Sequence, residues 1–259
     1  FDRSLAATAA VQTPGLPAPS LVVWPETSVP RLLHQAQPAF DAMAAAAGGQ
    51  ADILAGVLRW AEGARGGYFN AVVHLTAQGA PEGVYDKHHL VPFGEYMPGR
   101  DLFDRLGIDA LAALPGGFRA GPGPRVIQTA LGPVLPLICY EAVFARHTRT
   151  DTRPALIVHL TNDAWFGTYS GPYQHLMQAR MRAIETGLPV VRSANTGVSA
   201  VIDPAGRIMA QIPLGQAGFA DAVLPKPAPI TLYARMGDGP LAVFCVVLAG
   251  LLWFRRYWI

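Results

Sequence analysis

Cysteine and charge are both scarce in this chain of 259 residues. The two cysteines, Cys139 and Cys245, lie in segments of very different character, so the sequence predicts neither a disulfide nor a cysteine-rich metal motif. Charged residues make up 15% of the chain and are nearly balanced, 20 basic against 18 acidic, which leaves no electrostatic footprint for nucleic acid. We therefore expect no nucleic-acid partner, no metal ion and no cofactor.

The chain also lacks an N-terminal methionine, a signal-peptide core and transit-peptide character, and we interpret it as part of a longer protein. It has no internal repeat and no low-complexity tract. Apolar residues, in contrast, are abundant: they make up 51% of the chain, which is high for a soluble enzyme and indicates membrane contact. A chain of this length can bury one sizeable α/β core, with or without a small appendage.

Short apolar runs alternate with helical patterns along the chain. Helices are predicted over 32–47 and 172–186, with the remains of a helix at 4–11 and a short helical piece within 101–124. In the helix at 172–186, Leu176, Ala179, Ala183 and Ile184 share one face. Strands are predicted at 21–24, 53–60, 68–75, just before Lys87, and at 125–129, 134–138, 156–160, 190–191, 198–202 and 207–212. Hairpins mixed with this alternation favour a mixed α/β sandwich over an all-parallel sheet.

One cysteine occupies a position suited to chemistry. The apolar run 134–138 reads as a buried strand that delivers Cys139 at its end, where a turn or helix begins. A thiol followed by backbone N–H groups can act as a nucleophile beside an oxyanion site. A buried structural cysteine fits the same pattern, because free cysteine is among the most buried residue types. The pattern alone leaves both interpretations open.

Three charged residues stand near other predicted strand ends. Pro25 keeps Trp24 extended, so Glu26 lies at a strand end, as an active-site base or as a solvated loop carboxylate. Lys87 follows another strand and could lower the pKa of a thiol. Glu95 is either a surface charge or a second active-site carboxylate. Spacing alone does not establish that these side chains converge on the cysteine.

Two adjacent histidines, His88 and His89, suggest a metal site at first sight. Neighbouring residues on a strand face opposite ways, and no further Cys/His cluster supports chelation, so we do not predict a metal there.

The C-terminal segment differs from the rest of the chain. Residues 241–254 are uncharged and mostly apolar, and Arg255 and Arg256 follow among aromatic residues. Fourteen residues cover roughly 21 Å, short of the ~30 Å hydrocarbon core, which suits a buried helix. The stretch 239–259 is long enough to span, and its aromatics and basic pair suit a membrane interface. We favour a membrane helix whose C-terminus lies in the cytoplasm.

Several motifs together resemble the nitrilase (carbon–nitrogen hydrolase) superfamily. They are Trp24-Pro25-Glu26, Tyr85-Asp86-Lys87, the loop from His89 to Glu95, and Ile138-Cys139-Tyr140-Glu141. The segments 162–167, 174–175 and 179–183 and the apolar C-terminal helix are similar to the apolipoprotein N-acyltransferase family. The resemblance implies an α/β fold, a four-layer αββα nitrilase-like sandwich over 1–235, with its first strand expected to be missing. A single C-terminal transmembrane helix and short basic tail would follow over 236–259.

The same resemblance implies roles for individual residues. Cys139 would be the nucleophile, Glu26 its general base, and Lys87 the stabiliser of the oxyanion, helped by a backbone N–H near Tyr140. Glu95 matches a further essential carboxylate. Other residues implied to support the site or bind substrate are Tyr140, Glu141, Trp165 and Phe93. Trp165, Phe166, Phe93 and Tyr96 would line an acyl path or insert at the membrane, although ordinary loop packing explains these aromatics equally well.

The implied reaction is a ping-pong acyl transfer in the bacterial inner membrane, with the catalytic domain on the periplasmic side. A phospholipid would give an acyl chain to Cys139 as a thioester, and the N-terminal diacylglyceryl-cysteine of a lipoprotein would accept it. A soluble or membrane-tethered amidase or nitrilase acting on a small amide would share Glu26, Lys87 and Cys139, and stays as the alternative.

Overall fold

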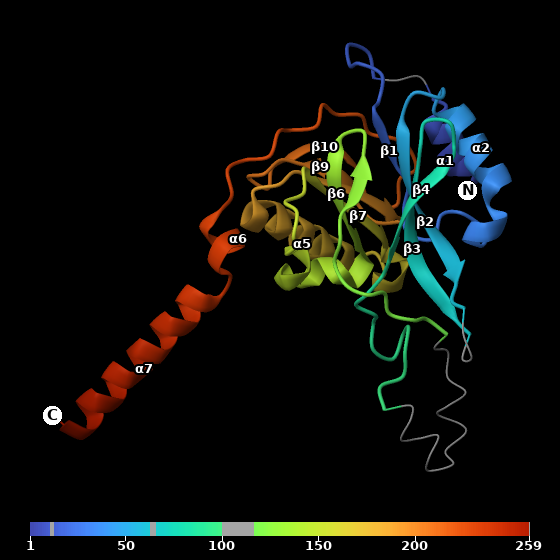
Figure 1. The fold of residues 1–259 in the computed structure, drawn as a ribbon. Helices are drawn as coiled ribbons and strands as arrows, with labels where there is room; N and C mark the ends of the chain where they lie inside the picture. The colour runs from blue at the N-terminus through green and yellow to red at the C-terminus, as the bar shows by residue number, and fades with distance from the viewer. Residues whose placement is uncertain (11–12, 63–65, 100–116, 259) are drawn as a thin grey trace.

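The computed structural model describes residues 1–10, 13–62, 66–99 and 117–258. Two β-sheets lie face to face, and helices cover the outer face of each sheet (Figure 1). Most of the segment 101–124, within which a short helical piece is predicted, lies outside the described residues.

The first sheet is built from the N-terminal third of the chain. Its strands follow the order β1-β2-β3-β4, in which β1 runs parallel to β2 and the remaining pairs are antiparallel. The strands are β1 (Leu21–Val23), β2 (Asp52–Trp60), β3 (Tyr68–Leu75) and β4 (Pro81–Asp86). The strand predicted just before Lys87 is therefore confirmed as β4.

The second sheet has six strands in the order β10-β9-β8-β7-β6-β5. Its centre, β6-β7-β8, is parallel, and both flanks are antiparallel. The strands are β5 (Ile127–Thr129), β6 (Gly132–Ile138), β7 (Leu156–Asn162), β8 (Val190–Asn195), β9 (Ser199–Ile202) and β10 (Ile208–Ile212). The mixture of parallel and antiparallel pairs confirms the predicted mixed sandwich.

The helices match the predicted ones with two refinements. The helix predicted over 32–47 is a 3-10 turn followed by an α-helix with a proline in its first turn, and the long helix at 171–186 ends at the left-handed Gly187. The α-helices are α1 (Asp2–Thr8), α2 (Gln37–Ala46), α5 (Gly171–Thr186), α6 (Leu232–Met236) and α7 (Gly239–Trp258). The 3-10 helices are η1 (Leu33–Gln35), η2 (Cys139–Val143), η3 (Ala145–Thr148) and η4 (Asp163–Phe166).

Three apolar clusters confirm the four layers. One packs α1 and α2 on the first sheet, through side chains such as Phe40 and Val73. A second packs α5 on the second sheet, through Leu176 and Ile157. The third fills the space between the sheets and includes Cys139. The burial of apolar side chains in these clusters holds the layers in helix–sheet–sheet–helix order.

Two local predictions were wrong. Ile184 does not share the buried face of α5, because 51% of its side chain is exposed while Leu176, Ala179 and Ala183 are buried. The strand predicted at 156–160 was too short: β7 continues to Asn162, and η4 follows directly. Pairing with β8 through Asn195 explains the longer strand.

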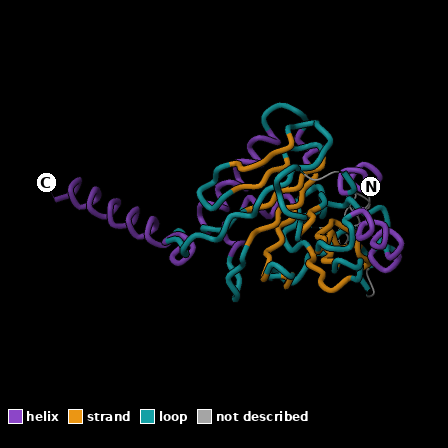
Figure 2. The backbone as a smooth tube through the Cα atoms, turned by 90° about the horizontal axis from the view of Figure 1, so that it is seen from above, coloured by secondary structure: helices purple, strands orange, loops and turns teal. Residues whose placement is uncertain are grey.

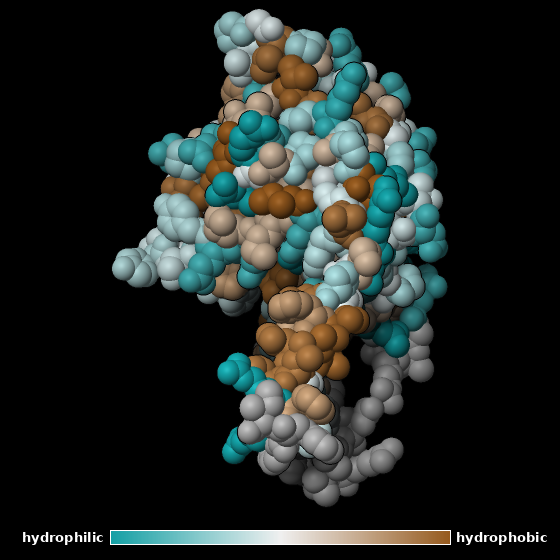
Figure 3. Space-filling view, turned by 90° about the vertical axis from the view of Figure 1, so that its left-hand side faces the viewer, coloured by the Kyte–Doolittle hydropathy of each residue, from teal (hydrophilic) through white to brown (hydrophobic). Residues whose placement is uncertain are grey.

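The C-terminal helix α7 stands away from the sandwich (Figures 1 and 2). It has 20 residues, and by length and composition its stretch Gly239–Arg256 could cross a membrane. None of that stretch is buried inside the molecule, and its apolar side chains form a continuous hydrophobic surface (Figure 3). These observations confirm an apolar C-terminal helix and disfavour a buried core helix.

Candidate active site

The candidate site lies where strands of both sheets end. Glu26 follows β1, Lys87 follows β4, and Cys139 follows β6 as the first residue of η2. Glu26 and Lys87 are buried, and Cys139 is 8% exposed. The loop bearing Glu26 passes so close to β2 that a side chain at Gly56 would collide with it. Glycine at that position allows the close approach.

Two carboxylates flank the Lys87 ammonium. Its Nζ donates a hydrogen bond to Glu95 Oε1 at 2.8 Å and lies 3.7 Å from Glu26 Oε1. Glu95 also accepts from the Val91 N–H at 2.8 Å, which ties the 91–95 loop to the lysine. Burial lowers the pKa of Lys87, but Glu26 and Glu95 outweigh it and raise the pKa overall. Lys87 is therefore a cation, and Glu95 is no ordinary surface charge.

The Cys139 thiol interacts with this charged pair. Burial and the Glu26 charge raise its pKa and Lys87 lowers it, and the balance is a pKa of about 11. Thr161 forms a side-chain hydrogen bond with the thiol. At neutral pH the resting cysteine is therefore a thiol, and a nucleophilic role requires a base.

Glu26 has the environment of such a base. Its two oxygens accept from Asn70 Nδ2 at 2.6 Å and from the Asn162 N–H at 2.7 Å. Burial raises the pKa of Glu26, even though Lys87 and these two donors lower it. A carboxylate with a raised pKa accepts a proton more readily than a solvated one. Neither Asn70 nor Asn162 was assigned a role from the sequence.

Glu141 joins the two sheets beside the nucleophile and is fully buried. It accepts from the Ile138 N–H at 2.8 Å, from Tyr85 Oη at 2.9 Å and from the His88 N–H at 2.8 Å. Burial raises the pKa of its carboxyl, but the His88 ring and these donors lower it overall. Glu141 is therefore an ionised bridge between the end of β6 and the segment after β4.

The prediction that His88 and His89 face opposite ways was wrong, because both residues lie beyond the end of β4. Their rings contact the two nitrogens of His147: His88 Nε2 lies 2.9 Å from Nδ1, and His89 Nδ1 lies 2.9 Å from Nε2. Burial and the neighbouring His88 lower the pKa of His147 to about 4. Among the described residues, no group of three or more His, Cys, Asp or Glu side chains could hold a metal ion.

The predicted aromatic residues are mostly exposed. Trp165 and Phe93 expose 86% and 73% of their side chains, and Phe93 has a left-handed φ of 63°. The ring centroids of Phe166 and His175 are 5.3 Å apart. Tyr140 lies with its ring against His89 and Phe144. Loop packing alone does not explain Trp165 and Phe93, because so little of either side chain is packed.

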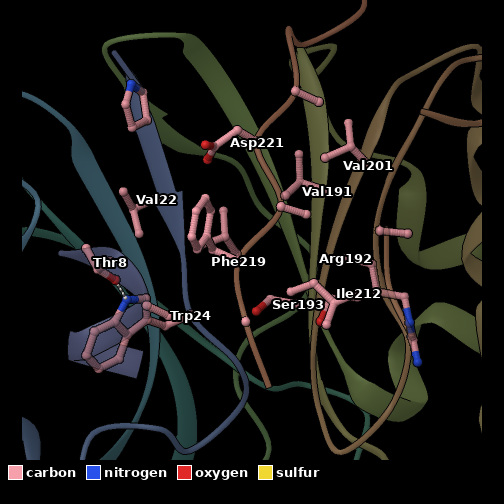
Figure 4. Close-up of a pocket in the computed structure, with 18 of the residues that line it drawn as sticks. Thr8, Val22, Trp24, Val191, Arg192, Ser193, Val201, Ile212, Phe219 and Asp221 are labelled. Atoms are coloured by element: carbon pink, nitrogen blue, oxygen red, sulfur yellow. Dashed lines mark hydrogen bonds between the residues drawn. The ribbon is translucent and has the colours of Figure 1, made fainter. Parts of the chain in front are cut away.

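A separate cavity of about 560 Å³ lies between β1 and strands β8 and β9 of the second sheet (Figure 4). Its lining includes Val22, Trp24, Val191, Phe219 and Asp221. Glu26, Lys87 and Cys139 do not line it, so it is distinct from the candidate site.

Behind Cys139 lies a buried polar group that the sequence did not assign to any role. His159 Nε2 and His175 Nε2 each lie 3.1 Å from the Cys139 carbonyl oxygen. Asp163 and Arg192 complete the group. They come from β7, η4, α5 and β8, and the pairing of β7 with β8 together with the packing of α5 on the second sheet brings them together.

The model of the carbon-nitrogen hydrolase family matches residues 4–226. The chain belongs to this carbon-nitrogen hydrolase family. It is also similar to proteins named apolipoprotein N-acyltransferase. It is 46% identical over 251 residues to that of Bradyrhizobium diazoefficiens, covering 95% of this chain and 47% of the relative. It is 44% identical over 243 residues to that of Rhodopseudomonas palustris, covering 92% and 45%. The chain thus spans a little under half the length of these relatives.

Solved structures with the family's fold include an amidase from Nesterenkonia sp., with a TM-score of 0.59 and 18% identity, covering 93% of this chain and 86% of that one. A carbon-nitrogen hydrolase from Helicobacter pylori G27 has a TM-score of 0.58 and 18% identity, covering 76% and 74%. At this identity the likeness concerns the fold alone, and it agrees with the four-layer sandwich of this carbon-nitrogen hydrolase.

Proposed function

We propose that this carbon-nitrogen hydrolase domain is the catalytic part of an apolipoprotein N-acyltransferase, with Cys139, Glu26 and Lys87 as its catalytic residues. One observation carries the proposal: a buried thiol, carboxylate and ammonium interact with one another in a chain whose 40–46% identical relatives bear that name. The apolar helix α7, which lies outside the sandwich, supports a membrane substrate. The proposal covers the activity, the substrates and the roles of the three residues.

In the first half-reaction, Glu26 takes the thiol proton as Cys139 Sγ attacks the ester carbonyl of a phospholipid. Lys87 and the Tyr140 N–H stabilise the oxyanion. When the tetrahedral intermediate collapses, Glu26 returns the proton to the departing lysophospholipid alcohol. The acyl chain stays on Cys139 as a thioester.

In the second half-reaction, the amine of a diacylglyceryl-cysteine at a lipoprotein N-terminus attacks the thioester carbonyl. Glu26 accepts the amine proton and passes it to the departing Cys139 sulfur, which regenerates the thiol and leaves an amide. The buried setting of Glu26 and Lys87 limits water at the thioester. Excluding water favours the amine over hydrolysis.

Supporting residues extend this arrangement. Glu95 holds Lys87 in place through their 2.8 Å hydrogen bond, and Glu141 fixes the turn after β6. Trp165 and Phe93 offer exposed aromatic surface suited to lipid or to the membrane interface. No nucleic acid, metal or cofactor has a part in the scheme.

The same proposal divides the chain into a catalytic domain over 1–235, with a first strand supplied from outside these residues, and a membrane helix with a short basic tail over 236–259. Arg255 and Arg256 lie in the last turn of α7. Basic residues favour the cytoplasmic side of a membrane, which puts the catalytic domain on the periplasmic face of a bacterial inner membrane.

A membrane-tethered or soluble amidase is the second candidate. Membership of the carbon-nitrogen hydrolase family favours it, because the same three residues could cleave a small amide with water as acceptor.

The deciding experiment supplies membranes containing the whole protein with a phospholipid and a synthetic diacylglyceryl-cysteine peptide. We expect the peptide to gain one amide-linked acyl chain, and Cys139→Ala to abolish the transfer while the protein remains folded. Cys245→Ala is the matched control and should retain the wild-type rate. Hydrolysis of a small amide without acylation of the peptide would contradict the acyltransferase proposal and favour the amidase.

A further inference from the structure

The nucleophile occupies an unusual backbone conformation. Cys139 has a φ of 49°, in the left-handed region that side-chain-bearing residues rarely adopt. Such a conformation persists where the surroundings enforce it. The Ile138 N–H is held by Glu141 on one side of the cysteine, and the Cys139 carbonyl is held on the other side.

Two histidines hold that carbonyl, and each presents its Nε2 to the carbonyl oxygen. Arg192 Nη1 lies 2.8 Å from His159 Nδ1 and can only donate, so the single proton of the His159 ring is on Nε2, facing the carbonyl. His175 faces acceptors with both nitrogens: Asp163 Oδ1 at 2.9 Å and the Cys139 carbonyl oxygen at 3.1 Å. A carbonyl oxygen can only accept, so the hydrogen bond at His175 Nε2 is one in which the ring N–H donates to the Cys139 carbonyl.

Asp163 and Arg192 close the group into a ring. Arg192 Nη2 pairs with Asp163 Oδ2 at 2.5 Å, and neither side chain has any exposed surface. Gly197 packs directly on Asp163, and a side chain there would collide with the carboxylate. Every strong donor and acceptor in the ring has a partner, so the ring is rigid.

The ring also determines where the next N–H points. In a trans peptide the carbonyl of one residue and the N–H of the next point in opposite directions. Two donors that draw the Cys139 carbonyl oxygen into the core therefore turn the Tyr140 N–H the opposite way. An intrahelical acceptor is not available to that N–H, because it belongs to the first turn of η2.

We propose that His159, His175, Asp163 and Arg192 form a carbonyl clamp, a set of positioning residues that fixes the Cys139–Tyr140 peptide and aims the Tyr140 N–H at the acyl oxygen. The clamp does not touch the substrate and does not deprotonate the thiol. It rests on the proposed role of Cys139 as an acyl-accepting nucleophile. Its contribution therefore belongs to steps that form an oxyanion, and not to other reactions of the thiol.

Two reactions of the same thiol separate these effects. A p-nitrophenyl ester of a medium-chain fatty acid acylates Cys139 through an oxyanion and releases a burst of nitrophenol. Iodoacetamide alkylates the thiolate by displacement, without any oxyanion. In the whole protein, with Cys245→Ala removing the second thiol of these 259 residues, we expect His175→Leu to lower the burst rate about a hundredfold, the scale of losing an oxyanion donor. The plateau alkylation rate at high pH should change by less than about threefold, because displacement forms no oxyanion.

A second variant restores the clamp's hydrogen bond. His175→Gln places an amide N–H near the position of Nε2, and the burst rate should return to within about tenfold of wild type, since a donor again holds the carbonyl. His74→Leu is the matched control: His74 is a buried histidine of β3 paired with Asp52, outside the site, so its loss should lower the unfolding temperature but not the burst rate of folded protein.

The outcomes are distinct. A burst that survives in His175→Leu, or one that falls in parallel with alkylation, overturns the clamp and leaves the acyltransferase proposal standing. If the protein with His175 intact gives no burst that depends on Cys139, both the clamp and the acyltransferase proposal are overturned. A selective loss of the burst, with rescue by His175→Gln, supports the clamp.

Discussion

The surroundings of Glu26 have opposing effects on the charge of its carboxylate. It is buried, which disfavours its charge, yet Lys87, Asn70 and the Asn162 N–H all favour the carboxylate. The balance raises its pKa, so the site retains a base that is destabilising when ionised. Asn70 turns its amide N–H toward Glu26, while its Oδ1 is buried and has no hydrogen-bond partner within the described part of the protein.

The substitution Glu26→Gln should therefore abolish activity and increase stability. The raised pKa means that Glu26 stabilises the fold below its unfolded value of 4.5 and loses that contribution as pH rises through the folded pKa. At pH 7 the neutral amide avoids the free-energy cost of burying the Glu26 charge. Asn70 can also turn its free oxygen toward the new amide N–H. We expect acylation to fall at least about 10²-fold and the unfolding temperature at pH 7 to rise.

Thermal unfolding at pH 7 and pH 4 tests this directly. The stability gain should be present at pH 7 and absent at pH 4. A variant less stable than wild type at pH 7 would contradict the burial argument for Glu26.

Glu141 should behave in the opposite way. Its pKa is lowered overall, so its carboxylate stabilises the fold above about pH 4.5, and the contribution is lost as pH falls through the folded pKa. Glu141→Gln places an amide N–H among donors and should cost about 3 kcal/mol at pH 7. Urea unfolding from pH 7 to pH 3 should show the difference shrinking below pH 4.5.

The exposed Glu82→Gln is the matched control and should leave stability unchanged within about 0.5 kcal/mol. A difference between wild type and Glu141→Gln that stays constant down to pH 3 would count against an ionised Glu141.

At the scale of elements, apolar runs and turn residues predicted nearly all strands and the long helix α5, because burial and turn chemistry are local signals. Strand ends also indicated Glu26, Lys87 and Cys139 as candidates. The carbonyl clamp was not predictable, because Asp163 and Arg192 meet only through the pairing of β7 with β8. The positions of Asn70 and Glu141 likewise depend on how the two sheets face each other.

A cysteine in α7 allows its membrane insertion to be tested by thiol labelling. Cys245 lies in its middle, and with Cys139→Ser it is the only thiol left in these residues. If α7 spans the bilayer, a membrane-impermeant maleimide should label Cys245 at least about tenfold more slowly in intact vesicles than in urea, because thiolates do not form in hydrocarbon.

Arg256→Cys in the same background, with Cys245→Ala, provides the control. It should be labelled from the cytoplasmic side, where the basic end of the helix is expected. Equal labelling of Cys245 in vesicles and in urea would mean that α7 lies outside the membrane.

At the scale of the whole molecule, a rigid sandwich and an external apolar helix serve different parts of one task. The sandwich gathers charges from both sheets around one thiol, and in the proposed function the helix would keep that thiol at a lipid surface. The cavity between β1 and β8 is lined by none of Glu26, Lys87 and Cys139. The chain spans a little under half the length of the relatives that it matches.

The central claim is an acyl chain carried on Cys139. The most direct measurement gives membranes containing the whole protein a phospholipid with a labelled acyl chain and maps the label by peptide. The account predicts a hydroxylamine-sensitive label on the peptide that contains Cys139, which disappears when a diacylglyceryl-cysteine peptide is added and reappears on that peptide as an amide. A Cys139 peptide that never carries label, while the diacylglyceryl peptide is still acylated, would contradict it.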